Sequence, residues 1–284
     1  WGHPTTGSDP SCAPSLALDP YIGIEGMRVL LDRGYTVVAT DYTGMGTEGP
    51  DSYLIGDTEG HNVLDAVRAA QHIPEAHASS DVVLWGHSQG GQAVLFAAEL
   101  AAEYAPELTI KAVAAAAPAA DLTALMETHL TDISGVTIGS YAFSAFATIY
   151  ADRGAELSEI LTPEAQKILP EMNKLCLLTH ISELHSIAGP VVGKFVSADP
   201  TTTEPWKTFL EENSAGASGF DAPLLVLQGL SDELIRPPDT EQYVQRAKDL
   251  GITVTYRTIK DATHGTIAYL GLADLDGWLA SLGL

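Results

Sequence analysis

The chain has 284 residues, of which 45% are apolar, and this is enough to build the large core of a single α/β domain. It carries 14 basic and 37 acidic side chains, and the net charge of −23 excludes a general nucleic-acid binder, which needs a basic face. The same charge disfavours docking on anionic lipid. No run approaches the length of about 18 apolar residues that a membrane-spanning helix needs, so the sequence predicts no transmembrane segment.

The sequence begins at Trp1 without an initiator methionine, a basic region or an apolar signal segment. We therefore expect a mature, trimmed or partial chain. Two cysteines, Cys12 and Cys176, are too few for a disulfide scaffold or a zinc cage. They are compatible with one long-range bridge, which the sequence alone leaves open.

Short runs of β-branched and apolar residues alternate along the chain with longer helical patterns. The runs that predict strands are residues 35–40, 82–85, 110–117, 224–228 and 252–259, and the patterns that predict helices are 23–32, 58–72, 89–104, 240–250 and 273–282. Several strands are continuously apolar, as strands buried on both faces of a parallel sheet are. Gly34 and Gly251 follow helical patterns and are expected to end them in the left-handed conformation. The alternation predicts an α/β fold with a doubly wound, mostly parallel sheet.

One long segment interrupts this alternation. Residues 121–219 contain helix-like stretches at 122–127 and 163–178 but no strong strand. We expect a helical cap inserted into an α/β core made of residues 1–120 and 220–284. The alternative is a separate second domain, which the return of the strand pattern at residue 224 disfavours.

The strongest motif is Gly86-His87-Ser88-Gln89-Gly90, which matches G-x-S-x-G between a predicted strand and a predicted helix. In that context the motif is a nucleophile elbow, a sharp turn that exposes the serine hydroxyl at a helix N-terminus. The flanking glycines are needed because side chains two residues away would collide with the neighbouring chain. The motif therefore makes Ser88 the candidate nucleophile.

A serine nucleophile needs a general base and an acid that orients it, in the chain order Ser, acid, His. His264 is the only histidine beyond the last predicted core strands, and it lies in a loop. Asp232 follows the strand at 224–228 in a tight turn, with Glu233 as a rival. Asp261 is a weaker candidate, better explained as a solvated loop acid.

A tetrahedral oxyanion needs backbone N–H donors. Gln89 follows the nucleophile and supplies one donor by the geometry of the elbow. The second donor comes from one of two Gly- and Thr-rich loops, His3 to Gly7 or Asp41 to Gly46.

Cofactor and metal signatures are weak in this sequence. There is no GxGxxG or Walker loop, and His180, Glu183 and His185 lack the spacing of a zinc motif. We therefore expect no metal site and no required cofactor.

Several segments, in this order, resemble the secretory lipases of the Candida antarctica lipase A type and their actinobacterial relatives, within the α/β-hydrolase superfamily. They are WGHPTTG at 1–7, CAPS at 12–15, DYTG at 41–44, GHSQGG at 86–91 and YAPEL at 104–108. The resemblance covers nearly the whole chain, and the second and last of these segments are the most specific.

The resemblance implies a secreted carboxylic-ester hydrolase with a helical cap over its site, acting on small-molecule or lipid esters. It favours Asp41 over the His3 loop as the second oxyanion donor. The groups that it carries over are the nucleophile Ser88, the acid Asp232, the base His264, the oxyanion donors Gln89 and Asp41, and a disulfide between Cys12 and Cys176.

The chain also departs from the family pattern. Members of the family carry a segment with the first strands of the sheet before the position of Trp1, and the prototype has a late flap over an acyl tunnel. Little room remains for such a flap after Asp232, which favours shorter or bulkier esters over long-chain lipids. Two other functions stay open at this point: an acyltransferase with the same triad, and a non-catalytic binding protein on a hydrolase scaffold.

Overall fold

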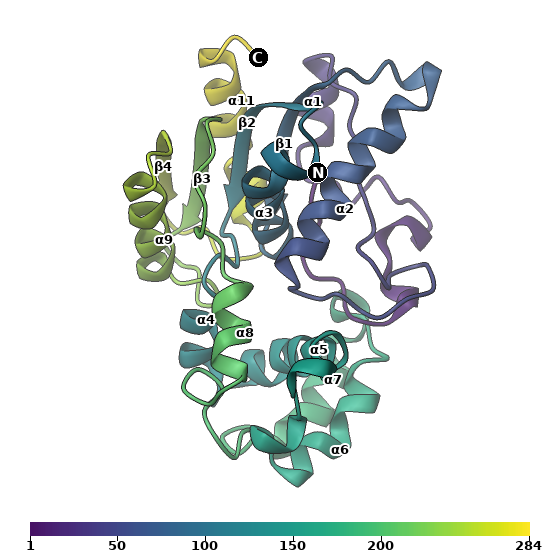
Figure 1. Cartoon of the computed structure of the whole chain (residues 1–284), viewed down its shortest axis with the longest axis vertical. Helices are drawn as coiled ribbons and strands as arrows, with labels where there is room; N and C mark the ends of the chain where they lie inside the picture. The colour runs from purple at the N-terminus through teal and green to yellow at the C-terminus, as the bar shows by residue number, and fades with distance from the viewer.

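The computed structural model describes all residues from 1 to 284 and contains one sheet of four strands in the order β1-β2-β3-β4. Every neighbouring pair of strands is parallel. The strands are β1 (Asp81–His87), β2 (Thr109–Ala116), β3 (Leu224–Gly229) and β4 (Val254–Ile259). The α/β fold with a parallel sheet is thereby confirmed (Figure 1).

Helices cover both faces of the sheet. On one face, the core joins β-strand side chains such as Leu84 and Val226 to α2 (Gly56–Gln71), α3 (Gln89–Tyr104) and α9 (Pro237–Asp249). On the other face, Trp85 and Leu227 join α1 (Met27–Asp32), α10 (Ile267–Leu270) and α11 (Leu272–Ser281). Because successive strand residues point to opposite faces, each strand contributes to both cores. Gly34 and Gly251 adopt positive φ after α1 and α9, as predicted.

The strand predicted at residues 35–40 is wrong. Between Thr36 and Thr40 the only backbone group with a hydrogen-bond partner is the Val38 carbonyl, which accepts from the Trp1 amino group at 2.6 Å. A strand is defined by a ladder with a neighbour, and this single bond to Trp1 does not make one. Its apolar side chains have another role: Tyr35 and Val37 are partly buried against the core and line a groove.

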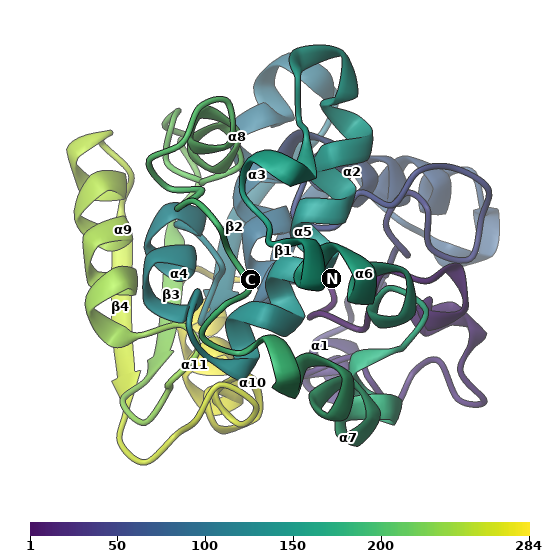
Figure 2. The ribbon, with the colours of Figure 1, turned by 90° about the horizontal axis from the view of Figure 1, so that it is seen from below.

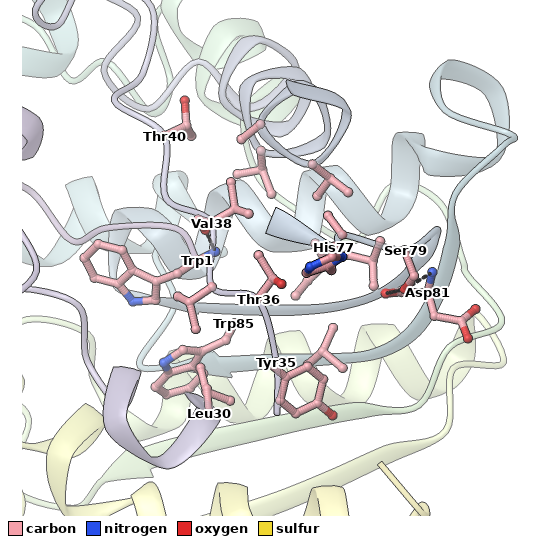
Figure 3. A pocket seen from close by; sticks show the side chains of 18 of the residues that line it. Trp1, Leu30, Tyr35, Thr36, Val38, Thr40, His77, Ser79, Asp81 and Trp85 are labelled. Atoms are coloured by element: carbon pink, nitrogen blue, oxygen red, sulfur yellow. Dashed lines mark hydrogen bonds between the residues drawn. The ribbon is translucent and has the colours of Figure 1, made fainter. Parts of the chain in front are cut away.

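This groove separates residues 35–40 from β1 and has a volume of about 260 Å³. Figure 3 shows Trp1, Val38 and Trp85 toward one end of it and His77, Ser79 and Asp81 toward the other. The flank of β1 that faces the groove makes only one bridge, between Gly2 and Gly86 at its carboxyl end.

Between β2 and β3 the chain forms five α-helices and no strand. They lie together below the sheet in Figure 1 and across its near end in Figure 2. The helices are α4 (Leu122–His129), α5 (Ile133–Ile149), α6 (Pro163–Met172), α7 (Leu177–Ala188) and α8 (Trp206–Glu212). Short 3-10 helices complete the chain at Pro10–Cys12, Pro14–Leu16, Pro74–Ala76, Ala151–Arg153, Leu157–Glu159 and Gly189–Val191.

Side-chain caps explain where three of these helices begin. The side chains of Asp121, Asp132 and Thr162 accept hydrogen bonds from the first turns of α4, α5 and α6. The single helix predicted at 163–178 is instead two helices, because the chain is extended at Cys176 before α7 begins.

Cys176 forms a disulfide with Cys12, 164 residues earlier in the chain. The bridge ties the N-terminal segment to the start of α7. No helix combines the length and the apolar composition that crossing a membrane requires.

Candidate active site

Ser88 occupies a strained turn between β1 and α3. Its φ of 56° and ψ of −120° lie outside the ordinary helix and strand regions. The turn requires glycine at positions 86 and 90. A Cβ added at Gly86 would overlap the carbonyl oxygen of Gly90, and a Cβ added at Gly90 would overlap that of Gly2. Ser88 N–H donates to the Ala116 carbonyl at 3.0 Å, which anchors the turn to β2.

Two hydrogen bonds join Ser88 to the predicted base and acid. Ser88 Oγ lies 2.9 Å from His264 Nε2, and His264 Nδ1 lies 2.9 Å from Asp232 Oδ2. An ionised carboxylate only accepts, so Nδ1 carries the imidazole proton and Nε2 is left to accept the serine proton. Ser88 is 7% exposed and Asp232 is 4% exposed, so the carboxylate acts on the imidazole with little solvent screening.

The loop after β3 holds Asp232 in place. Its second oxygen, Oδ1, accepts from the N–H groups of Leu234 and Ile235 at 2.9 Å each. The structure thus brings Asp232 to the histidine and leaves its rivals apart: Glu233 and Asp261 are both exposed and neither bonds to His264.

Gln89 begins α3, and its backbone N–H donates to no protein acceptor. Its side chain bonds to Glu59 on α2, whose Oε1 accepts from Gln89 Nε2 at 2.7 Å and from Leu54 N–H at 2.8 Å. Burial raises the pKa of Glu59 well above its ordinary value. Glu59 is not among the residues predicted from the sequence, although a carboxylate that shares the buried face of a helix with Val63 and Leu64 is a signal that marks it.

The two loops considered for the second oxyanion donor touch each other. Tyr42, next to Asp41, donates from its hydroxyl to the His3 carbonyl at 3.1 Å and stacks on the His3 ring at 4.2 Å. The Asp41 carboxylate accepts from Ser15 N–H at 3.1 Å, and no hydrogen bond joins Asp41 to Ser88 or Gln89. The His3 loop lies directly against the elbow, since its backbone closes on Gly90.

The groove beside β1 is a separate feature. None of the residues Ser88, Asp232 and His264 lines it. His180, Glu183 and His185 are exposed on α7, and no group of three or more histidine, cysteine or carboxylate side chains is arranged to hold a metal ion.

Comparison with known proteins gives the family and the fold of the chain. The family model described as "Secretory lipase" matches residues 22–281. Among curated proteins, the chain is 27% identical over 295 residues to Lipase A of Arthroderma benhamiae, covering 95% of this chain and 60% of that protein. The chain thus spans well under two thirds of the length of that relative.

Solved structures show the same fold at low sequence identity. The X-ray structure of Candida antarctica lipase A matches with a TM-score of 0.78 at 20% identity, covering 96% of this chain and 66% of that one. The rice cell wall degrading esterase LipA from Xanthomonas oryzae matches with a TM-score of 0.74 at 21% identity, covering 99% of this chain and 79% of that one.

Proposed function

Because the chain belongs to the secretory lipase family, we propose that it hydrolyses carboxylic esters of small molecules or lipids through an acyl-enzyme formed on Ser88. The observation that carries the proposal is the pair of 2.9 Å hydrogen bonds linking Ser88 Oγ, His264 and Asp232. A nucleophile bonded to a base that is itself oriented by a buried acid is the arrangement that serine hydrolases use.

In the proposed reaction, Ser88 Oγ attacks the ester carbonyl carbon while its proton passes to His264 Nε2. Asp232 stabilises the resulting imidazolium through the Nδ1–H bond. The tetrahedral intermediate collapses when His264 returns the proton to the leaving alkoxide, which departs as the alcohol. Water then attacks the acyl-enzyme with the same proton transfers in reverse order, releasing the acid and restoring Ser88.

The negative oxygen of each intermediate is assigned to two backbone donors, the N–H groups of Gln89 and Asp41. Support for Gln89 comes from its free N–H at the first residue of α3, where the helix dipole also favours negative charge. The assignment of the Asp41 N–H as the second donor rests on the family resemblance. The loop of Asp41 contacts the His3 loop through Tyr42.

Residues 121–219 are proposed as the cap over this site. They form helices α4 to α8, and the disulfide between Cys12 and Cys176 fastens the start of α7 to the N-terminal segment. A disulfide persists in an oxidising compartment, which together with the family supports an extracellular protein.

The test is hydrolysis of p-nitrophenyl esters from acetyl to palmitoyl, with the wild type and Ser88→Ala side by side. We expect kcat of the variant to fall by roughly 10³- to 10⁶-fold with an unchanged fold, because only the nucleophile is removed. The acyl chain length that gives the highest activity measures the length of the acyl pocket. We expect this optimum among the shorter esters.

A fluorophosphonate probe provides the control that does not depend on the choice of ester. It should label the wild type at Ser88 and leave Ser88→Ala unlabelled. Equal activity of the two proteins, or labelling at another residue, would overturn the mechanism.

A further inference from the structure

A second buried histidine lies inside the elbow and is not used by the proposed reaction. His87 Nδ1 lies 2.7 Å from Glu25 Oε1, and His87 Nε2 lies 2.9 Å from the backbone carbonyl oxygen of His264. The side chains of His87 and Glu25 are only 5% and 3% exposed. We call this group, which joins Glu25 and His87 to the His264 carbonyl, the Glu25–His87 clasp.

Hydrogen-bond chemistry fixes the direction of the clasp. A carbonyl oxygen only accepts, so His87 Nε2 carries a proton and donates it to the His264 carbonyl. On the other side of the ring, Nδ1 faces a carboxyl group, and two bare lone pairs would repel each other. Glu25 and His87 therefore hold one further proton between them, and the ring is fixed from both sides.

The clasp acts on the loop that carries the base. Asp232 is held by two backbone N–H groups of its own loop, and Ser88 is anchored to β2. His264 lies in the loop after β4, and its backbone carbonyl has no partner other than His87. The imidazole of His264 also lies 5.0 Å from that of His87, measured between ring centroids. Hydrogen bonds between Thr263 and Thr266 shape the loop on either side of His264, and His87 is the group that holds the His264 carbonyl itself.

A gain in fold stability does not explain why Glu25 and His87 are buried together. Glu25 Oε2 is buried without a hydrogen-bond partner. Such a carboxylate costs desolvation energy that one bond does not offset, and apolar residues of similar volume often stabilise a fold as well or better. A residue kept at that cost is better explained by orientation of the base.

We propose that Glu25 and His87 are positioning residues that hold the His264 loop so that Nε2 stays in line with Ser88 Oγ. The proposal rests on the proposed function. It predicts that breaking the clasp lowers kcat and leaves substrate binding nearly unchanged, because His264 acts on the proton and not on the bound ester.

A related contact on the cap supports the principle. His129 Nδ1 lies 2.6 Å from Asp132 Oδ2, and His129 Nε2 lies 2.9 Å from the Leu234 carbonyl in the loop that holds Asp232. The acid loop and the base loop are each bonded through a backbone carbonyl to a histidine that a carboxylate fixes.

The experiment compares Glu25→Leu, Glu25→Gln and His87→Leu. Glu25→Leu leaves Nδ1 without a partner, and we expect kcat per active site to fall about 10- to 100-fold, as displacements of about 1 Å do, with little change in KM. Glu25→Gln should retain most of the activity, since its amide N–H donates to Nδ1 and preserves the Nε2–H bond. His87→Leu should resemble Glu25→Leu.

Active sites are counted by fluorophosphonate labelling, so that a loss of folded protein is separated from a loss of turnover. His72→Leu is the matched control: His72 also bonds to a backbone carbonyl, that of Arg68, but at the exposed end of α2. It should leave kcat unchanged. If kcat per labelled site is the same in wild type and Glu25→Leu, or if Glu25→Gln loses as much as Glu25→Leu, the clasp has no positioning role.

A second readout remains valid if the protein hydrolyses no ester. In ¹⁵N-histidine NMR spectra, the wild type should show His87 protonated at Nε2, and Glu25→Leu should move the Nδ1–H resonance of His264. Unmoved His264 signals would overturn the clasp, whereas absent esterase activity with moved signals would overturn only the proposed function.

Discussion

The two flanks of β1 differ sharply. On one flank, β2 pairs with it from Asp81 to His87, and the facing residues of β2 are mostly fully buried alanines. On the other flank, one bridge joins Gly2 to Gly86, and the rest faces the groove of about 260 Å³. Only at the carboxyl end of β1, where Ser88 follows, does each flank have a neighbouring backbone.

This difference shows where the geometry of the site is determined. Beside Gly86 the backbones of Gly2, Gly90 and Gly91 approach so closely that no side chain fits. Ser88 therefore receives its unusual backbone conformation from contacts at the end of the strand. The amino-terminal part of β1 has β2 as its only neighbouring strand, and an open flank there is compatible with an intact site.

The largest expected effect comes from adding one methyl group at the carboxyl end of β1. In Gly86→Ala the new Cβ would overlap the backbone of Gly90, which belongs to α3 and has no flexible atom to move aside. We expect a loss of more than about 4 kcal/mol in the free energy of unfolding, or no folded protein, together with loss of esterase activity. Urea titration followed by circular dichroism measures it.

The matched control is Gly265→Ala, next to His264. A Cβ there meets no atom within 4 Å, and its φ is not in the positive region. We expect a change within about 0.5 kcal/mol. Near-equal stabilities of the two variants would contradict the view that close approach at the end of β1 shapes the elbow.

The features that the sequence predicts are those set by local patterns, and the features that it does not predict depend on contacts between distant segments. The α/β alternation, four of the five strands and the residues of the hydrogen-bonded series follow from patterns local in the chain, such as G-x-S-x-G and a histidine after the last strand. The strand at 35–40 fails because apolarity indicates burial but not a partner, and a ladder needs a second chain beside it.

The Glu25–His87 contact could not be predicted for a related reason. The two residues lie 62 positions apart, and nothing in either local pattern points to the other. Glu59 is different, since its place on the apolar face of a helix is visible in the sequence. Disagreement between a residue type and its predicted environment is therefore the signal that could have been used.

An intermediate effect is expected at a valine with a paired strand on each side, compared with a valine beside the open groove. Val226, in β3, is fully buried between β2 and β4, whereas Val37 is partly exposed along the groove. Val226→Ala should cost about 2 kcal/mol, from lost burial and an unfilled cavity. Val37→Ala should cost less than about 1 kcal/mol, since solvent already reaches it. Equal losses in urea titrations would mean that the groove is closed in solution.

The smallest effect is expected from the charge of Asp51, which is linked through Tyr53 to the His3 loop. Tyr53 reaches the His3 loop by a 2.9 Å bond between its hydroxyl and that of Thr5, and Asp51 accepts from Tyr53 N–H at 3.2 Å. Burial raises the pKa of Asp51 to about 6, from an ordinary value of 3.8. The folded protein therefore holds the proton over a pH range in which the unfolded chain has lost it, and this carboxyl makes stability fall as pH rises from 3.8 to about 6.

Asp51→Asn removes that titration and keeps an oxygen to accept from Tyr53 N–H. We expect the variant to equal the wild type below about pH 4 and to exceed it by about 1 kcal/mol above pH 7, after allowing for partial solvent screening of the carboxylate. Unfolding free energies measured from pH 3.5 to 8 test this. A constant difference across that range would show that Asp51 acts through packing, because only the proton linkage makes the two curves diverge between pH 4 and pH 6.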